Sequence, residues 1–182
     1  SEGSSLIDFD PEEIKRGMTI YSSVAPIEWA DNKINFVDTP GYLDYEGELR
    51  SGLAVGDNAL IVVSAKDGVE SGTEKAVKLV NHKKIPTIFF VNKMDEENAS
   101  FDKVYGDLRE KFGKAVIPFE VPIIDNGVVK GSINVLRKKA WYYDDRTTAK
   151  EVPADYTDIV EEYYMQIAEA IAMADDELME KF

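Results

Sequence analysis

The sequence predicts an α/β fold: a mostly parallel sheet with flanking helices over residues 1–113, and then a smaller α+β unit over residues 114–182. Three observations predict it. The apolar runs at 58–65 and 85–92 have the composition of strands buried on both faces. A segment with helical character follows each run, and alternating strands and helices are typical of a parallel sheet. Beyond Gly113 the pattern changes to short strands separated by turn residues.

The first part begins with two predicted strands, at 21–29 and 33–38. Asp31 and Asn32 have the composition of the turn that joins them. A helix weakened by its glycines is predicted at 45–55, just before the first apolar run.

Two further helices complete this part. At 71–84, Ser71 and Glu74 have the spacing of a capping box, so Ser71 is expected to cap the helix. The helix at 99–113 is predicted to end at Gly113, because glycine readily adopts the conformations that close a helix.

The second part begins with a hairpin, which Asn126-Gly127 between two apolar runs predicts. A third strand is expected at 138–145, and we interpret its aromatic residues as packing within this unit rather than as a platform for bases. The segment 155–182 is predicted to be a helix with one broad apolar face. That face consists of Ile159, Val160, Tyr163, Tyr164, Ile167, Ala168, Ile171 and Ala172.

Composition restricts the class of function. The chain has 35 acidic and 21 basic residues, a net charge of −14, and 44% apolar residues. Such an acidic surface argues against direct nucleic-acid binding, which depends on basic side chains that neutralise phosphates. No apolar run is long enough for a transmembrane helix, and the N-terminal residues do not resemble a signal peptide, so no membrane association is expected. The absence of cysteine fits a reducing compartment, and we expect a cytoplasmic location.

The apolar run at 85–92 ends in "NKMD", which is Asn92, Lys93, Met94 and Asp95. This composition suits a guanine base, because guanine presents a ring N–H and an amine side by side. A carboxylate such as Asp95 can accept both hydrogen bonds, whereas adenine would leave it unpaired. Asn92 can bond another edge of the base or fix the loop, and the stem of Lys93 can lie over the ring face. A polar loop that merely closes a strand is the alternative.

A second polar loop, "DTPG", follows the strand at 33–38 and consists of Asp38, Thr39, Pro40 and Gly41. Asp38 is a hard oxygen ligand for Mg²⁺, either directly or through water. Pro40 fixes the turn, and Gly41 allows its backbone N–H to approach a phosphate. By itself this motif is more typical of an ordinary turn. Because ligands bind at the carboxyl ends of parallel strands, the two loops together predict one crevice for a guanine nucleotide and Mg²⁺.

Longer segments around these motifs carry a resemblance to a known family. They are "RGMTI" (16–20), "KINFVDTPGYLDYEGELRSGL" (33–53), "ALIVVSAKDGVESGTEKAVKLV" (59–80) and "IPTIFFVNKMD" (85–95). Together they resemble the translational GTPases, most closely the elongation factor G family. The segments 118–123, 129–143 and 174–182 resemble the subdomain that this family inserts into its GTPase domain. The resemblance implies a partial P-loop-GTPase-type sheet followed by that inserted α+β subdomain.

The resemblance also implies roles for single residues. Thr19, in the first switch, would be a Mg²⁺ ligand, and Asp38 would hold the same ion through water. Gly41 would sense the γ-phosphate through its backbone. Asn92 and Asp95 would select guanine, while Lys93 packs on the nucleotide. The implied activity is hydrolysis of GTP to GDP with Mg²⁺, coupled to translocation on the ribosome.

The sequence departs from this family in two ways. The phosphate-binding pattern G-x-x-x-x-G-K-[ST] does not occur in the 182 residues, and "SAK" (64–66) precedes "NKMD" instead of following it. We interpret "SAK" as a strand end and the chain as a fragment that alone binds GTP weakly or not at all. Tyr42 stands where the family carries the His that orients the attacking water, so hydrolysis is expected to be slow or strongly dependent on a partner.

Alternatives remain at this stage. A ribosomal-protection GTPase of the tetracycline-resistance type is one, and a natural pseudo-GTPase that acts as a binding module is another. A phosphotransferase that uses Asp38 lacks a supporting phosphate loop or catalytic His. The segment 12–16 is interpreted as a solvated part of the switch, and His82, the only histidine, as a surface residue.

Overall fold

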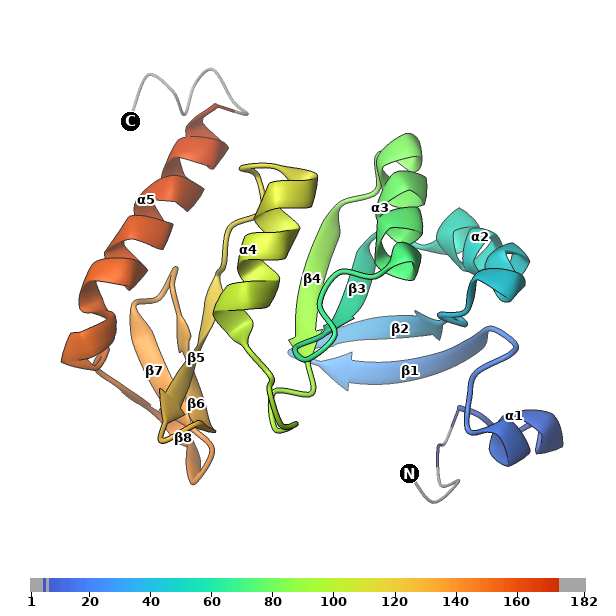
Figure 1. Ribbon diagram of the computed structural model, residues 1–182, viewed down its shortest axis with the longest axis horizontal. Coiled ribbons are helices and arrows are strands. Elements are labelled where there is room, and N and C mark those ends of the chain that lie inside the picture. Colours follow the sequence, from blue (N-terminus) through green and yellow to red (C-terminus); the bar gives the residue numbers. More distant parts are fainter. Residues whose placement is uncertain (1–4, 6, 174–182) are drawn as a thin grey trace. The chain divides into compact units, whose positions relative to one another are not determined.

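A computed structural model describes residue 5 and residues 7–173 of the chain (Figure 1). The chain forms two compact units. The first unit comprises Ser1–Val63 and Glu70–Phe90, and the second comprises Ser64–Val69 and Val91–Phe182. The division at residue 113 expected from the sequence stays a prediction, because compactness alone does not mark the limits of an inserted subdomain.

The first unit begins with a short helix and a hairpin. Helix α1 is Pro11–Arg16, and the antiparallel strands β1 and β2 are Ser23–Trp29 and Asn32–Asp38. Ala30 and Asp31 form the turn, both with positive φ (47° and 61°). The predicted turn was therefore displaced by one residue, because Asn32 pairs with Trp29 inside the ladder.

A short 3₁₀ turn and a helix follow the hairpin. The turn η1 is Leu43–Tyr45, and helix α2 is Glu46–Val55, as predicted. Gly52 of α2 is buried, and a Cβ built on it would lie 2.6 Å from Thr39 Cγ2. The glycine that weakens the helix thus lets α2 approach the loop after β2.

Strands β3 and β4 form the parallel pair that the two apolar runs predict. Strand β3 is Ala59–Ser64, helix α3 is Ser71–Lys83, and strand β4 is Thr87–Asn92. The Ala59 N–H donates to the Pro86 carbonyl at 2.9 Å; further along both strands, the Ala65 N–H donates to the Asn92 carbonyl at 2.8 Å. This same-direction register, with a crossover helix between the strands, confirms the α/β class and its parallel sheet with flanking helices.

Two predictions for this region were wrong. Neither strand is buried on both faces, because only one side of each is covered in the described chain. In β3, Ile61 and Val63 are buried, whereas Leu60 and Val62 are exposed. In β4, Ile88 and Phe90 are exposed. The capping box at Ser71 is also absent. Glu70 occupies the N-cap position without a capping side-chain bond, since Ser71 is already the first helical residue.

The second unit contains helix α4 and a four-stranded sheet. Helix α4 is Phe101–Phe112; Ser100 caps it by accepting from the Lys103 N–H, and Gly113 ends it as predicted. The sheet is an antiparallel meander in the order β5-β6-β7-β8. The strands are Glu120–Asp125, Val128–Asn134, Lys139–Tyr142 and Asp145–Lys150.

The first turn of this meander confirms the predicted hairpin. Asn126 and Gly127 both have positive φ, 49° and 78°. Strand β8 was not predicted, because "DRTTAK" is a polar sequence at an exposed edge, where charged residues are tolerated and no apolar alternation is needed.

Helix α5 covers the meander and completes the core of the second unit. A 3₁₀ turn, η2, is Ala154–Tyr156, and α5 is Thr157–Ala172. The predicted apolar face is confirmed where Val160 and Tyr163 pack on the sheet, while the predicted extension over 174–182 lies outside the described residues. The buried cluster consists of Val121, Ile123, Ile133, Val135, Ala140, Val160 and Tyr163. No helix in the described part of the chain is long and apolar enough to cross a membrane.

Candidate functional site

The carboxylate of Glu13 organises the segment that precedes β1. It is only 2% exposed and accepts hydrogen bonds from the backbone N–H groups of Asp10 (3.1 Å), Ile20 (2.9 Å) and Tyr21 (3.0 Å). The bonds from Tyr21 and Ile20 hold the pKa of Glu13 below its usual value, because they stabilise the charged form. The interpretation of residues 12–16 as wholly solvated was therefore wrong for Glu13.

Thr19 and Asp38, the two predicted Mg²⁺ ligands, lie together with Asp8 in the first unit. The Thr19 hydroxyl donates to Asp8 Oδ1 at 2.9 Å. Burial, reinforced by the charge of Asp8, raises the pKa of Asp38 above its usual value, and the Thr19 hydroxyl opposes this shift. Sequence patterns did not indicate Asp8, because it is an isolated carboxylate without a motif.

These side chains offer two carboxylates and a hydroxyl, which are the hard oxygen donors that Mg²⁺ prefers. Among residue 5 and residues 7–173, no group of three or more His, Cys, Asp or Glu side chains could hold a metal ion. Mg²⁺ in a nucleotide site usually keeps several waters and binds through one or two protein ligands and the phosphates, and Thr19 and Asp38 are donors of the kind that it uses there.

The loop after β2 presents the other predicted switch residues. Pro40 is buried, Thr39 is half-buried, and Gly41 and Tyr42 are exposed. A Cβ built on Gly41 would meet no atom within 4 Å, and Gly41 has no positive φ. Neither packing nor backbone conformation in the described chain therefore requires glycine here. The backbone of Gly41 is exposed and carries no side chain that would keep a ligand away from its N–H.

Asn92, Lys93, Met94 and Asp95, called the base loop below, begin at the end of β4. Asn92, Lys93 and Asp95 are exposed, and Met94 is half-buried. Lys93 has a φ of 59°, in the left-handed region that residues other than glycine rarely adopt. Residues at turns and helix ends of the described chain, such as Asn126 and Lys84, share this conformation. The positive φ therefore marks a tight turn directly after β4.

The neighbouring loop at 64–68 contains the "SAK" sequence. The Ala65 N–H donates to the Asn92 carbonyl at 2.8 Å, and the Ala65 carbonyl accepts from the Ser100 N–H at 3.0 Å. The backbone of Ala65 is thus used within the protein, which confirms the interpretation of "SAK" as a strand end.

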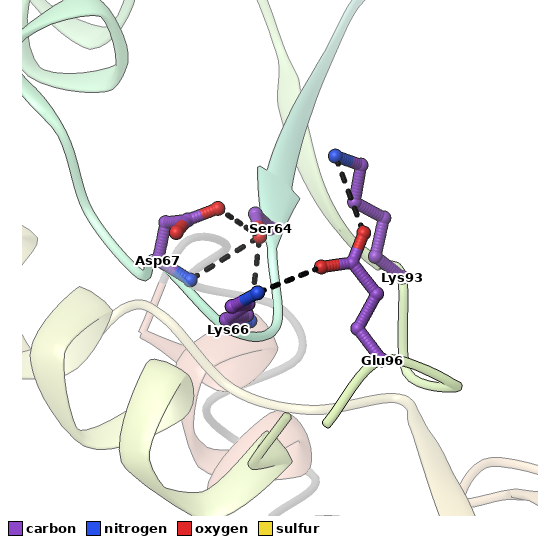
Figure 2. A network of polar contacts seen from close by, with 5 residues as sticks. All are labelled: Ser64, Lys66, Asp67, Lys93 and Glu96. Carbon is purple, nitrogen blue, oxygen red and sulfur yellow. Dashed lines mark hydrogen bonds and ion pairs between the residues drawn. The ribbon is translucent and has the colours of Figure 1, made fainter. Parts of the chain in front are cut away.

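Glu96, just after the base loop, connects it to this neighbouring loop (Figure 2). Its carboxylate lies 3.4 Å from the Lys93 ammonium and 3.5 Å from the Lys66 ammonium. In the sequence, Lys66 was noted only as part of "SAK", and Glu96 belongs to no motif. Their contact was not predicted, because it joins positions 30 residues apart.

The predicted site residues therefore fall into two groups. The switch group, Thr19, Asp38, Thr39, Pro40, Gly41 and Tyr42, belongs to the first unit, and the base loop belongs to the second. Their meeting in a single crevice stays a prediction. A cleft of about 340 Å³ in the second unit is lined by residues of α4, β5, η2 and α5 and by none of these predicted residues.

Comparisons with known proteins agree with these motifs. The family described as the elongation factor Tu GTP binding domain matches residues 1–177. A crystal structure of a Thermus thermophilus protein superposes with a TM-score of 0.91 at 32% identity, covering 99% of this chain and 27% of that one. The chain therefore belongs to the elongation factor Tu GTP-binding-domain family.

Two relatives narrow this assignment. An elongation factor G-like protein of Thermotoga maritima is 37% identical over 180 residues, and elongation factor G of Mycoplasma genitalium is 33% identical over 182 residues. Both similarities cover 98% of this chain but only 26% of the relative's length. They confirm the resemblance to translational GTPases of the elongation factor G type.

Proposed function

We propose that this chain selects guanine nucleotides through the base loop and responds to the γ-phosphate and Mg²⁺ through the switch group. One observation carries the proposal: Asp95 presents an exposed carboxylate at the carboxyl end of a parallel strand, two residues after a lysine held in the left-handed conformation. A carboxylate in this position suits the paired N–H donors of guanine. Asn92, also exposed, would contact another edge of the base.

In the switch group, Thr19 and Asp38 would hold Mg²⁺, and the Gly41 N–H would approach the γ-phosphate. Bound Mg²⁺ would neutralise phosphate charge. Loss of the γ-phosphate would then release the segment around Thr19 and Gly41, a change from order to disorder.

The activity of the whole protein follows as a second part of the proposal. Because the relatives are elongation factor G and an elongation factor G-like protein, we propose that the protein carrying this chain hydrolyses GTP on the ribosome, in the cytoplasm, during translocation. The phosphate-binding pattern does not occur in the 182 residues. We therefore expect this chain alone to bind nucleotide weakly.

The test is an NMR titration of the chain with GDP, IDP and ADP at millimolar concentrations in the presence of Mg²⁺. GDP is expected to shift the base-loop resonances more strongly than ADP. Asp95→Asn should weaken GDP binding about 10- to 100-fold, because a charged hydrogen-bond acceptor is lost. Glu97→Gln is the matched control, since Glu97 is an exposed carboxylate two residues away. Equal affinities for GDP and ADP, or an Asp95→Asn variant that binds like the control, would refute guanine selection by this loop.

A further inference from the structure

Glu96 contacts two lysines at once, each through a different carboxylate oxygen. Its Oε1 lies 3.4 Å from Lys93 Nζ, and its Oε2 lies 3.5 Å from Lys66 Nζ (Figure 2). Lys93 belongs to the base loop, whereas Lys66 belongs to the loop after β3. One carboxylate therefore links the two loops that end the parallel strand pair.

The backbone around Lys66 is braced. The Ser64 hydroxyl accepts from the backbone N–H groups of Lys66 (3.3 Å) and Asp67 (3.2 Å) and donates to Asp67 Oδ2 at 2.7 Å. The Gly68 N–H closes the turn on the Ser64 carbonyl at 2.9 Å, and Gly68 takes the positive φ of 75° that this turn needs. Lys66 thus extends toward Glu96 from a fixed turn.

At the other end of the contact, in the base loop, the backbone of Lys93 is strained. Lys93 stands at a φ of 59°, and the turn from Lys93 to Glu96 is closed by the Glu96 N–H donating to the Lys93 carbonyl at 3.2 Å. The Lys93 side chain is 55% exposed, so packing leaves it free to change rotamer. Its ion pair with Glu96 is the contact that restricts the ammonium.

We propose that Glu96 positions Lys93 for a nucleotide base and that Lys66 positions Glu96. This inference rests on the proposed function of the base loop. A lysine whose ammonium is held before binding loses less rotamer freedom when its methylene stem covers a ring, so affinity rises without a new contact to the ligand. Glu96 and Lys66 are positioning residues in this scheme, since neither contacts the base.

The size of the effect is bounded by exposure. The side chains of Lys66, Glu96 and Lys93 are 47%, 36% and 55% exposed, and ion pairs between exposed groups are weak and screened by salt. We therefore expect Glu96→Gln to weaken GDP binding by about two- to fivefold at low salt, and less at high salt.

The experiment measures GDP and IDP dissociation constants of the chain by NMR, at low and high salt. The variants are Glu96→Gln, Lys66→Met, Lys66→Arg, the Glu96→Gln/Lys66→Met double variant, and Glu97→Gln as control. Glu96→Gln should weaken the binding of GDP and of IDP equally, because Lys93 covers the ring and makes no contact with the amine that distinguishes the two bases. Asp95→Asn should instead alter the ratio of the GDP and IDP dissociation constants. Lys66→Met should lose no further affinity once Glu96 is Gln, and Lys66→Arg should behave like the unaltered chain.

Several results would overturn the proposal: a Glu96→Gln variant that binds GDP like Glu97→Gln, a loss that salt does not reduce, or additive losses in the double variant. A ligand-free measurement separates this proposal from the proposed function. Side-chain ¹³C relaxation of Lys93 should show greater mobility in Glu96→Gln, and unchanged mobility refutes the positioning of Lys93. If the unaltered chain binds no guanine nucleotide, the proposed function is refuted. The positioning of Lys93 for a base is then refuted as well, even if the relaxation data show that Glu96 orders Lys93.

Discussion

Tyr42 lies exposed in the loop that would face the γ-phosphate, with 61% of its surface accessible. A phenol has a pKa of about 10 and orients an attacking water less well than an imidazole does. Under the proposed function, we predict that Tyr42→His makes GTP hydrolysis on ribosomes faster by about tenfold or more, because proton-transfer groups typically contribute about 10²–10⁴-fold. Multiple-turnover phosphate release measures this. Matching rates for the two proteins would show that Tyr42 does not limit hydrolysis.

Glu13 gives a second prediction about a single residue, because its carboxylate holds the backbone of Ile20 and Tyr21. Glu13→Gln should lower the hydrogen-exchange protection of those two amides about tenfold, since bonds to a charged acceptor are the stronger ones. Glu12→Gln is the control, because Glu12 is exposed and pairs with Arg16 on the helix surface. Similar protection in both variants would contradict the role of Glu13.

The pH dependence of that protection follows from the direction of the shift. The pKa of Glu13 is lowered by folding, so its stabilising contribution is present above the ordinary glutamate value and is lost as pH falls through the lowered one. Protection factors of Ile20 and Tyr21 should therefore be constant above the ordinary glutamate pKa of about 4.3, decrease as pH falls below it, and reach their minimum once pH has passed the lowered value. Protection that already decreases above this range, or that does not depend on pH, would refute the assignment.

A residue of the site could be predicted from the sequence where a short local motif indicates its chemical role. Asp38 and Asp95 are recognisable because Asp38 ends a strand and Asp95 lies three residues beyond one, each in a short polar sequence. Asp8, Lys66 and Glu96 were not, since their importance comes from contacts with residues far away in the sequence. The pairing of Thr19 with Asp8 needs the folded chain to bring positions 8 and 19 together.

At the scale of single elements, two glycines of α2 differ in environment. A Cβ on Gly47 would meet no atom within 4 Å, whereas a Cβ on Gly52 would lie 2.6 Å from Thr39 Cγ2. Gly47→Ala should raise the free energy of unfolding by up to about 1 kcal/mol, because alanine favours the helix. Gly52→Ala should lower it by about 1–2 kcal/mol, because the clash moves the loop after β2.

Urea unfolding of both variants measures these changes, and the backbone resonances of Thr39 report the displaced loop. Equal stabilisation by both substitutions would mean that α2 does not need to approach Thr39 closely.

Hydrophobic patterning predicted most elements within a few residues, because apolar runs and helical periodicity reflect burial directly. It failed where burial is not the determinant. Helix α1 has six residues and is fixed by its capping contacts with Asp10 and Glu13, and β8 is a polar edge strand. The capping box at Ser71 failed because the helix begins one residue earlier than the motif implies.

At the scale of the whole molecule, the main feature is the excess of negative charge. The net charge of −14 implies self-repulsion in the folded state, which salt screens. Raising NaCl from about 10 to 150 mM shortens the Debye length from about 30 to 8 Å. We predict that Tm then rises by about 2–4 °C, equivalent to about 1 kcal/mol for a chain of this size. A neutral osmolyte at equal osmolality is the control for calorimetry, and a Tm that falls with salt would show that ion pairs outweigh the repulsion.

The meander of the second unit has a consequence for the order of folding. Each of β5, β6 and β7 pairs with the next strand in the sequence, so every pairing closes only a short loop. Strands β3 and β4 pair only after α3 has been placed between them, which closes a longer loop and costs more chain entropy. Although the meander is synthesised after β4, its sheet is therefore expected to form before the β3–β4 pair once the whole chain is free to fold.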